Sequence, residues 1–475
     1  MRQRLPAALA ALALAGCSLA PPYVQPPLQV PESWPVGDAY LRQSEATLPQ
    51  VGYQDIFRDP RLQQLIVEAI ANNRDIRVAA ANLAAARAQV RVARAGQFPT
   101  IGATGGASAT VDGKGNVSQS YSLQGGVSSF ELDLFGRLAN TTAAERERAL
   151  GTESAARTVR LALVADLAEA WATYASDADL LAIGKDTATI AQRAVELTRL
   201  RLEGGIAPRT DLRQAEQVLA TAQGDVAQQT SALARDLNLI RLLVGAEPSP
   251  TLLPASLSQV YAAIATLPAG LDSTVLLRRP DVVQAEYQLR AADLDIGVAR
   301  AALFPRISLT GLLGLASDAL GSLISAGAFH ATGGANAAYT IFDFGGRRAN
   351  IDVSRAQRDA ALASYEKAIQ TAFREVSDAL AVQGTIGERL RAARANTDAA
   401  TDVAHLEEER YRGGIDSFLN ELDAQRSLYS ARRSETAVLL TAVENRVELY
   451  RVLAADIAVA TPDGSPAPVV TAPRP

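Results

Sequence analysis

Asp133-Leu134-Phe135-Gly136-Arg137 in the first half of the chain recurs 210 residues later as Asp343-Phe344-Gly345-Gly346-Arg347. Two further pairs of segments keep the same order at separations of 206 and 209 residues: Phe98-Pro99-Thr100-Ile101 with Phe304-Pro305-Arg306-Ile307, and Glu203-Gly204-Gly205-Ile206 with Arg412-Gly413-Gly414-Ile415. Three ordered matches at a nearly constant offset predict an internal twofold repeat of one structural unit. We assign residues 51–245 to the first copy and 276–460 to the second, with a linker region over 246–275.

Each copy contains one very long helical pattern, over residues 138–203 and 347–412, and neither pattern contains proline. Small and apolar residues recur at steps of three and four, which is the spacing of a heptad seam. The positions in the first pattern are Leu161, Val164, Ala168, Trp171, Ala175, Ala178, Ala182, and those in the second are Leu362, Tyr365, Ile369, Ala372, Val376, Ala379. A helix of roughly 65 residues runs about 100 Å at 1.5 Å per residue, a length that favours a coiled coil or strut. A second helix is expected after each long one, over 208–245 and 417–456.

Two strands are predicted ahead of each long helix, over 100–111 and 121–133 in the first copy and over 307–316 and 335–343 in the second. Strands of about ten residues with weak alternation are typical of transmembrane β-barrels. A small soluble sheet is an alternative that the pattern leaves open. A single transmembrane helix over 307–329 is another alternative, which Asp318 and several glycines disfavour.

Four strands cannot close a barrel in lipid, because every backbone donor and acceptor needs a partner there. The smallest transmembrane barrels have about eight strands. If the strands cross a membrane, the chain must therefore oligomerise, and the periodicity does not choose the number of copies.

The N-terminus has the pattern of a secretory signal peptide over residues 1–16, with a basic start and a short apolar run ahead of Cys17. Because Cys17 is the only cysteine, we interpret this site as similar to a bacterial lipobox whose thiol carries acyl chains such as palmitate. An ordinary signal peptide with an incidental cysteine is the alternative. Residues 17–50 predict a lipidated, proline-rich, extended strap, and residues 461–475 predict a disordered tail.

The composition disfavours several classes of function. The formal net charge of −5 provides no basic surface for nucleic acid, and one cysteine with two histidines excludes a Cys/His zinc cluster. An enzyme is disfavoured because His330 and His405 are far apart in sequence and no nucleophile elbow or phosphate-binding loop occurs. A coiled-coil structural or adaptor protein without a pore is a further alternative, which the strands and the repeat disfavour.

A series of motifs follows in one order behind Cys17 and covers nearly the whole chain: Phe57-Arg58-Asp59-Pro60-Arg61-Leu62, Asn73-Arg74-Asp75, Arg278-Arg279-Pro280-Asp281-Val282, Ile296-Gly297-Val298-Ala299-Arg300-Ala301, Tyr411-Arg412-Gly413-Gly414-Ile415, Leu422-Asp423-Ala424-Gln425. The series resembles the TolC-like outer-membrane efflux channels, in their NodT-type lipoprotein branch. This resemblance implies a mostly α fold with a transmembrane β-barrel. Four strands per chain would complete a 12-stranded trimeric barrel, continued by a long α-helical coiled-coil periplasmic tunnel, with residues 246–275 at its equator.

The resemblance also implies a function. A member of this family is the outer-membrane component of a tripartite efflux system, a passive gated duct that exports small molecules. Its implied partners are sister copies in a homotrimer, a periplasmic adaptor (membrane fusion) protein and an inner-membrane resistance-nodulation-division pump. The expected location is the outer membrane of a Gram-negative bacterium, extending into the periplasm, and we expect no cofactor or metal besides the covalent lipid on Cys17.

Functional residues follow from the same resemblance. The adaptor would dock on two hairpin tips that contain Gly204, Gly205, Gly413 and Gly414. The periplasmic gate would involve five residues near these tips: Leu419, Asp423, Asp416, Tyr411, Asp211. A trimer would bring three copies of Asp423 near one axis, where like charges attract cations, and Leu419 could add an apolar ring. Without the resemblance, Asp423 would be interpreted as an ordinary solvated helix residue.

Overall fold

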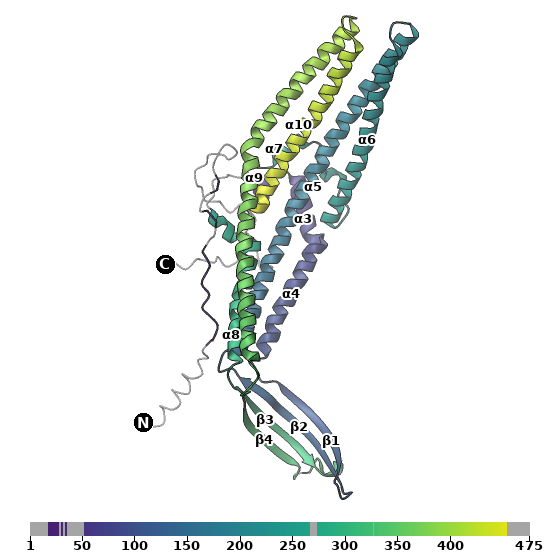
Figure 1. Cartoon of the computed structure of the whole chain (residues 1–475). Coiled ribbons are helices and arrows are strands. Elements are labelled where there is room, and N and C mark those ends of the chain that lie inside the picture. The colour runs from purple at the N-terminus through teal and green to yellow at the C-terminus, as the bar shows by residue number, and fades with distance from the viewer. Residues whose placement is uncertain are drawn as a thin grey trace. The chain divides into compact units, whose positions relative to one another are not determined.

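The computed structural model describes residues 18–27, 30, 31, 34, 35, 52–266, 273–325 and 327–453 (Figure 1). The predicted signal peptide over 1–16, the lipidation site Cys17, much of the strap and the tail over 461–475 lie outside the described residues. The chain divides into two compact units. Of the described residues, the first unit contains 18–27, 81–154 and most of 283–368, and the second contains the remainder.

The first unit contains one antiparallel sheet of four strands in the order β1-β2-β3-β4 (Figure 1). Its strands are β1 (Ile101–Val111), β2 (Val117–Leu132), β3 (Arg306–Ser317) and β4 (Phe329–Ala338). Each hairpin of the sheet comes from one half of the chain, and β2 pairs with β3 across a register shift between Val127 and Phe130. Within the described residues, β1 and β4 are the edges of this sheet.

The prediction of a fourth strand over 335–343 is wrong by about six residues, because β4 ends at Ala338. Residues 339–343 lead instead into a long helix, where the Asp343 carboxylate accepts the N–H groups of Gly345 at 3.2 Å and Arg347 at 3.1 Å. These residues therefore form a turn into the helix, whereas β4 itself consists mostly of alanine and glycine and has no clear alternation.

The other strands lie close to their predicted positions, and the alternative of a helix over 307–329 is wrong because β3 occupies its first half. β2 begins at Val117, four residues before the predicted start, because the turn is compact. The Asp112 carboxylate accepts the N–H groups of Lys114 and Asn116, which lets Val111 pair with Val117. No helix in the described ranges is both long enough and apolar enough for a membrane crossing.

Four helices contribute residues to both units, namely α4 (Arg74–Ala95), α5 (Arg137–Glu203), α8 (Pro280–Ala301) and α9 (Gly346–Arg412). α5 and α9 each have 67 residues, and each begins one residue before its predicted start. The predicted seam of α5 is confirmed over its first five positions, because Leu161, Val164, Ala168, Trp171 and Ala175 are buried, but Ala178 is half-buried and Ala182 is exposed. In α9 the predicted seam is buried except at Leu362, which is half-buried.

The second unit packs the α5/α6 and α9/α10 hairpins with short helices. Its other elements are α2 (Tyr53–Ile56), α3 (Pro60–Asn72), α6 (Arg209–Val244), η1 (Pro250–Leu252), α7 (Leu257–Ala263), η2 (Ser273–Arg278) and α10 (Phe418–Val452). Trp171 anchors this core: its indole N–H donates to the carbonyl of Leu252 at 2.9 Å while its ring is fully buried. Burial of such large side chains stabilises the unit by about 2–3 kcal/mol each.

Candidate functional site at the hairpin turns

The second unit presents two helical hairpin turns at the same end, one between α5 and α6 and one between α9 and α10 (Figure 1). In each turn the second glycine has a left-handed backbone, with φ of 69° at Gly205 and 70° at Gly414. The N–H of Ile206 donates to the carbonyl of Arg201 at 2.8 Å, and the N–H of Ile415 donates to that of Arg410 at 2.9 Å. Both helices therefore end in a Schellman motif, which glycine favours at this position.

The predicted tip glycines are therefore at the two turns, and they differ in role. A Cβ atom on Gly205 or Gly414 would meet no atom within 4 Å, so the backbone angle alone requires glycine there. Gly204 and Gly413 lie one residue earlier, where their N–H groups donate to helix carbonyls at 3.0 and 2.9 Å.

Two apolar side chains at the tips were missed as site residues in the sequence. Ile206 is 80% exposed and Ile415 is 73% exposed, each directly after the left-handed glycine. An exposed isoleucine at the same position of both turns offers matching apolar contacts to a partner. The sequence signal was available, because each isoleucine ends the repeated Gly-Gly-Ile segment.

Asp416 is held inside the second turn by neighbouring groups. Its carboxylate accepts the N–H of Ser417 at 2.8 Å and a guanidinium N–H of Arg410 at 2.9 Å, and it also accepts the side-chain amide of Asn420. The backbone N–H of Ser417, followed by Arg410, holds the pKa of Asp416 below its ordinary value. Asp416 therefore stays charged and ties the end of α9 to the start of α10.

Tyr411 is buried, with 7% of its surface exposed, in a cluster that joins the two hairpins. The Arg201 guanidinium lies 4.2 Å from the centroid of the Tyr411 ring, and the Phe418 ring lies 5.5 Å away. The same cluster includes Leu212 of α6 and Leu422 of α10. Tyr411 thus contributes packing and a cation–π contact between the hairpins.

Leu419 and Asp423 lie four residues apart on one face of α10 and are both exposed, Leu419 to 56%. Among the described residues, the Asp423 carboxylate has no hydrogen-bond or ion-pair partner. Asp211 differs, because it is half-buried in the first turn of α6, where its N–H donates to the carbonyl of Pro208 at 3.2 Å. Of the five predicted gate residues, Leu419 and Asp423 are exposed, Asp211 and Asp416 are half-buried, and Tyr411 is buried.

Glu421 is a titratable residue at the tip that the sequence did not indicate. Burial, followed by repulsion from Glu408, raises its pKa to about 7, against the attraction of Arg412 and Arg201. One of its carboxylate oxygens is buried without a hydrogen bond. A buried carboxylate between charged helices makes the packing of this tip depend on pH near neutrality.

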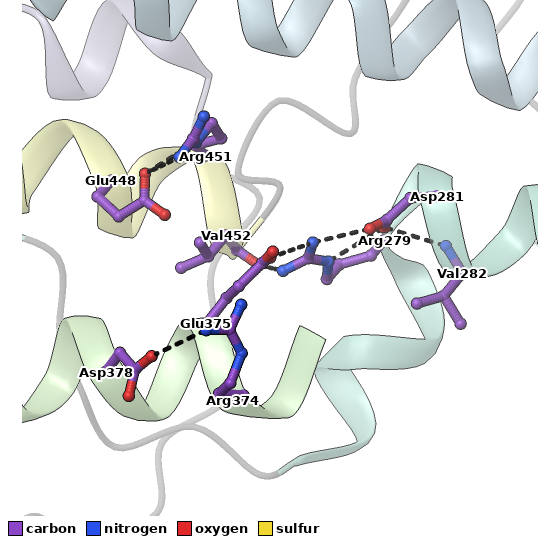
Figure 2. Close-up of polar contacts among 9 residues, drawn as sticks. All are labelled: Arg279, Asp281, Val282, Arg374, Glu375, Asp378, Glu448, Arg451 and Val452. Atoms are coloured by element: carbon purple, nitrogen blue, oxygen red, sulfur yellow. Dashed lines mark hydrogen bonds and ion pairs between the residues drawn. The ribbon is translucent and has the colours of Figure 1, made fainter. Parts of the chain in front are cut away.

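The Arg278–Val282 motif has a structural role in the same unit. Figure 2 shows Arg279 between Asp281 and Glu375, and its guanidinium donates to each carboxylate at 2.8 Å and to the carbonyl of Val452 at 3.1 Å. Arg279 is buried, and these carboxylates hold its pKa above the ordinary value although burial opposes the charge. The motif therefore joins the start of α8, the middle of α9 and the end of α10.

Known proteins share this architecture. A model of the outer membrane efflux protein family matches residues 65–246 and 271–455. The chain is 40% identical to the efflux pump outer membrane protein TtgC of Pseudomonas putida over 459 residues, 94% of each chain. The crystal structure of CusC matches at 33% identity and a TM-score of 0.83, covering 92% of this chain and 99% of CusC. The open state of the MtrE outer membrane channel of Neisseria gonorrhoeae matches at 30% identity and a TM-score of 0.83, over 92% and 98% of the two chains.

Proposed function

This chain belongs to the outer membrane efflux protein family, and from that premise we propose that three copies assemble into one gated duct. The chain is an outer-membrane channel component of an efflux system. In the proposed assembly, small molecules pass from a resistance-nodulation-division pump through a periplasmic adaptor into the duct and out of the cell. The duct is passive and performs no chemical step.

The two unpaired edges of the sheet carry this proposal. β1 and β4 have neighbours on one side only within the described chain, yet a sheet in lipid must pair every backbone donor and acceptor. Joining β4 of one copy to β1 of the next satisfies both edges. Three copies of four strands then make a twelve-stranded barrel, above the minimum of about eight.

The two halves of the chain support a repeat-based tunnel. The long helices α5 and α9 have 67 residues each, and the helices that follow them have 36 and 35 residues. The two hairpins of each chain supply four helices, so three copies would place twelve helices around a threefold axis. Helices of this length suit a tunnel across the periplasm.

The free face of α10 supports a gate at the hairpin end. Leu419 and Asp423 are exposed and lie on one face of α10, so threefold symmetry can bring three copies of each toward the axis. The leucines would form an apolar constriction and the carboxylates a cation-attracting ring. The hairpin ends would then be held in position by the other three residues, Tyr411, Asp416 and Asp211.

The two tips are proposed as the docking surface for the adaptor. The sharp reversal of each tip is set by its glycine pair, Gly204 and Gly205 in the first tip and Gly413 and Gly414 in the second. The exposed isoleucines that follow these glycines supply the apolar contacts. A photo-crosslinker at Ile415 should capture the adaptor that is encoded with the pump. The same group at exposed Leu242 of α6 should not capture it.

A lipid on Cys17 is proposed as the anchor, and the residues directly after it support this. The Ser18 hydroxyl donates to Asn140 at 2.9 Å, and Arg300 donates to the carbonyl of Leu19 at 3.0 Å. A Cβ on Gly297 would approach Ala20 to 2.8 Å, so the strap lies closely against α8. Asn140 lies in the first turn of α5, a few residues after the end of β2, which suits a lipid held near the sheet.

The assembly is tested with the purified full-length protein in detergent and in planar bilayers. We expect a heat-sensitive trimer on gels and discrete single-channel currents. A sample that stays monomeric and passes no current would contradict the duct.

A further inference from the structure

An open groove of about 390 Å³ lies in the first unit between the end of α4 and the start of α5. Eight residues line it: Val90, Arg91, Arg94, Gln97, Ala139, Thr142, Ala143, Arg146. Their spacing follows one face of each helix. Arg91 and Arg94 therefore line the α4 side of the groove and Arg146 lines the α5 side, with small side chains between them.

The three arginines of this groove are exposed, and no described carboxylate forms an ion pair with any of them. Arg91 makes only a long hydrogen bond, at 3.5 Å, to the carbonyl of Arg87. The surrounding sequence contains no acid at all from residue 76 to residue 111. On α5, Glu145 is already paired with Arg148 at 2.7 Å. The groove is therefore a local concentration of positive charge in a chain whose net charge is negative.

The floor of the groove is fixed by a polar contact. The side-chain amide of Gln97 donates to the Thr142 hydroxyl at 2.7 Å and to the carbonyl of Leu138 at 3.2 Å. These bonds tie the segment after α4 to the first two turns of α5. The two walls are thus held together before any ligand arrives, which lowers the entropic cost of binding.

The groove lies beside the end of the sheet where strands and helices meet. α4 ends at Ala95 and β1 begins at Ile101, only six residues later. Exposed aromatic side chains gather at the same end: Phe98, Tyr339, Phe342, Phe344. If the sheet crosses the membrane as proposed, these exposed aromatic rings would mark the headgroup region and the arginines would lie at headgroup depth.

We infer that this groove binds the phosphate of an anionic membrane glycerophospholipid. Guanidinium groups match phosphate oxygens with paired hydrogen bonds, and basic pockets at a membrane surface hold anionic headgroups. Arg300, which is 206 residues after Arg94 and matches it in the repeat, also has an oxygen acceptor, the carbonyl of Leu19. The inference rests on the proposed crossing of the membrane by the sheet, but binding is measured in detergent and needs no channel activity.

The test measures binding of dioctanoyl phosphatidylglycerol to the full-length protein in a non-ionic detergent, by calorimetry. The test variant is Arg91→Gln with Arg94→Gln. The matched control is Arg389→Gln with Arg426→Gln, which removes two exposed arginines from the second unit. Each groove arginine that is removed should weaken binding about fivefold, so the test variant should bind roughly 25-fold more weakly while the control binds like the parent protein.

Dioctanoyl phosphatidylethanolamine and inorganic phosphate identify the source of the phosphate. A lipid site is supported if neither of them displaces phosphatidylglycerol at equal concentration. Displacement by inorganic phosphate alone would overturn the lipid and leave a free-anion site. Equal binding of phosphatidylglycerol by the parent protein and the test variant would overturn the groove itself, and circular dichroism of the variant excludes misfolding as a cause of any loss.

Discussion

Glu421 shows how a single buried carboxylate can affect the packing of the tip. Its folded pKa of about 7 lies above the ordinary value of 4.5, so the folded chain holds this proton more tightly than the unfolded chain does. The stability that it contributes is therefore complete below about pH 4.5 and is lost as pH rises through about 7.

Replacing Glu421 with glutamine should remove that loss, because the amide stays neutral at every pH. We expect Glu421→Gln to melt at a higher temperature than the parent protein at pH 8 and at nearly the same temperature at pH 5. Asp423→Asn changes an exposed carboxylate on the same helix and serves as the control. If the difference between Glu421→Gln and the parent protein were the same at both pH values, the raised pKa would be contradicted.

Gly414 and Gly413 provide a second test at the scale of single residues. Gly414→Ala should cost about 1–2 kcal/mol because its φ of 70° is left-handed, even though space around it is open. Gly413→Ala lacks that backbone penalty and is the control. Hydrogen exchange over residues 409–418 should become roughly 5- to 30-fold faster in Gly414→Ala. Similar exchange in both variants would show that the Schellman turn does not limit opening of the tip.

The sequence predicted the tip at the level of the turn and less well at the level of side chains. Glycine pairs after a long helix indicate a reversal, and both turns are where the repeat places them. Burial cannot be read from spacing alone, because it depends on the neighbouring hairpin. For that reason the sequence indicated neither the burial of Tyr411 between the hairpins nor the half-buried carboxylate of Glu421.

At the scale of elements, the long helices were predictable because proline-free heptad patterns are a strong and redundant signal. Each helix has more than fifteen turns with the same heptad spacing, so its ends are predicted at the residues where this spacing begins and stops. Strand β4 has no such redundancy. After Phe329 and His330 its residues are small or polar, mostly alanine and glycine, so pairing with β3 and not its own pattern decides its register.

The Arg279 network is an element-scale feature that spacing could not predict, because its partners lie on three separate helices. Arg279→Ala would remove a buried guanidinium and leave the half-buried Glu375 carboxylate and the carbonyl of Val452 without this partner, and we expect a loss of about 2–3 kcal/mol. Arg374→Ala removes an exposed pair with Asp378 at 3.7 Å, also drawn in Figure 2, and should cost less than about 1 kcal/mol. Melting temperatures of the two variants measure the difference. A loss for Arg374→Ala as large as that for Arg279→Ala would contradict a structural role for the motif.

At the scale of the whole molecule, the described part of one chain has two unpaired sheet edges, β1 and β4, and an exposed face on α10. We propose that sister copies cover these surfaces and that a lipid anchors the chain. The lipid has a direct test. Cys17→Ser should abolish labelling by a radioactive fatty acid in growing cells, because serine cannot form the thioether. Ser18→Ala keeps the thiol, loses the hydroxyl's contacts with Asn140 and with the N–H of Ala20, and should still be labelled. Continued labelling of Cys17→Ser would refute the anchor.

The gate is the prediction that depends on the complete assembly. In a trimer, Leu419→Ala with Asp423→Ala removes three apolar side chains and three carboxylates from the narrowest part of the duct, so ions should pass more freely. We expect planar-bilayer conductance to rise severalfold and cation preference to fall, because less charge faces the axis. The control, Leu242→Ala with Asp378→Ala, changes the same residue types at exposed positions of α6 and α9 away from the turns. If the gate variant and the control had equal conductance, Leu419 and Asp423 would not form the narrowest part of the duct.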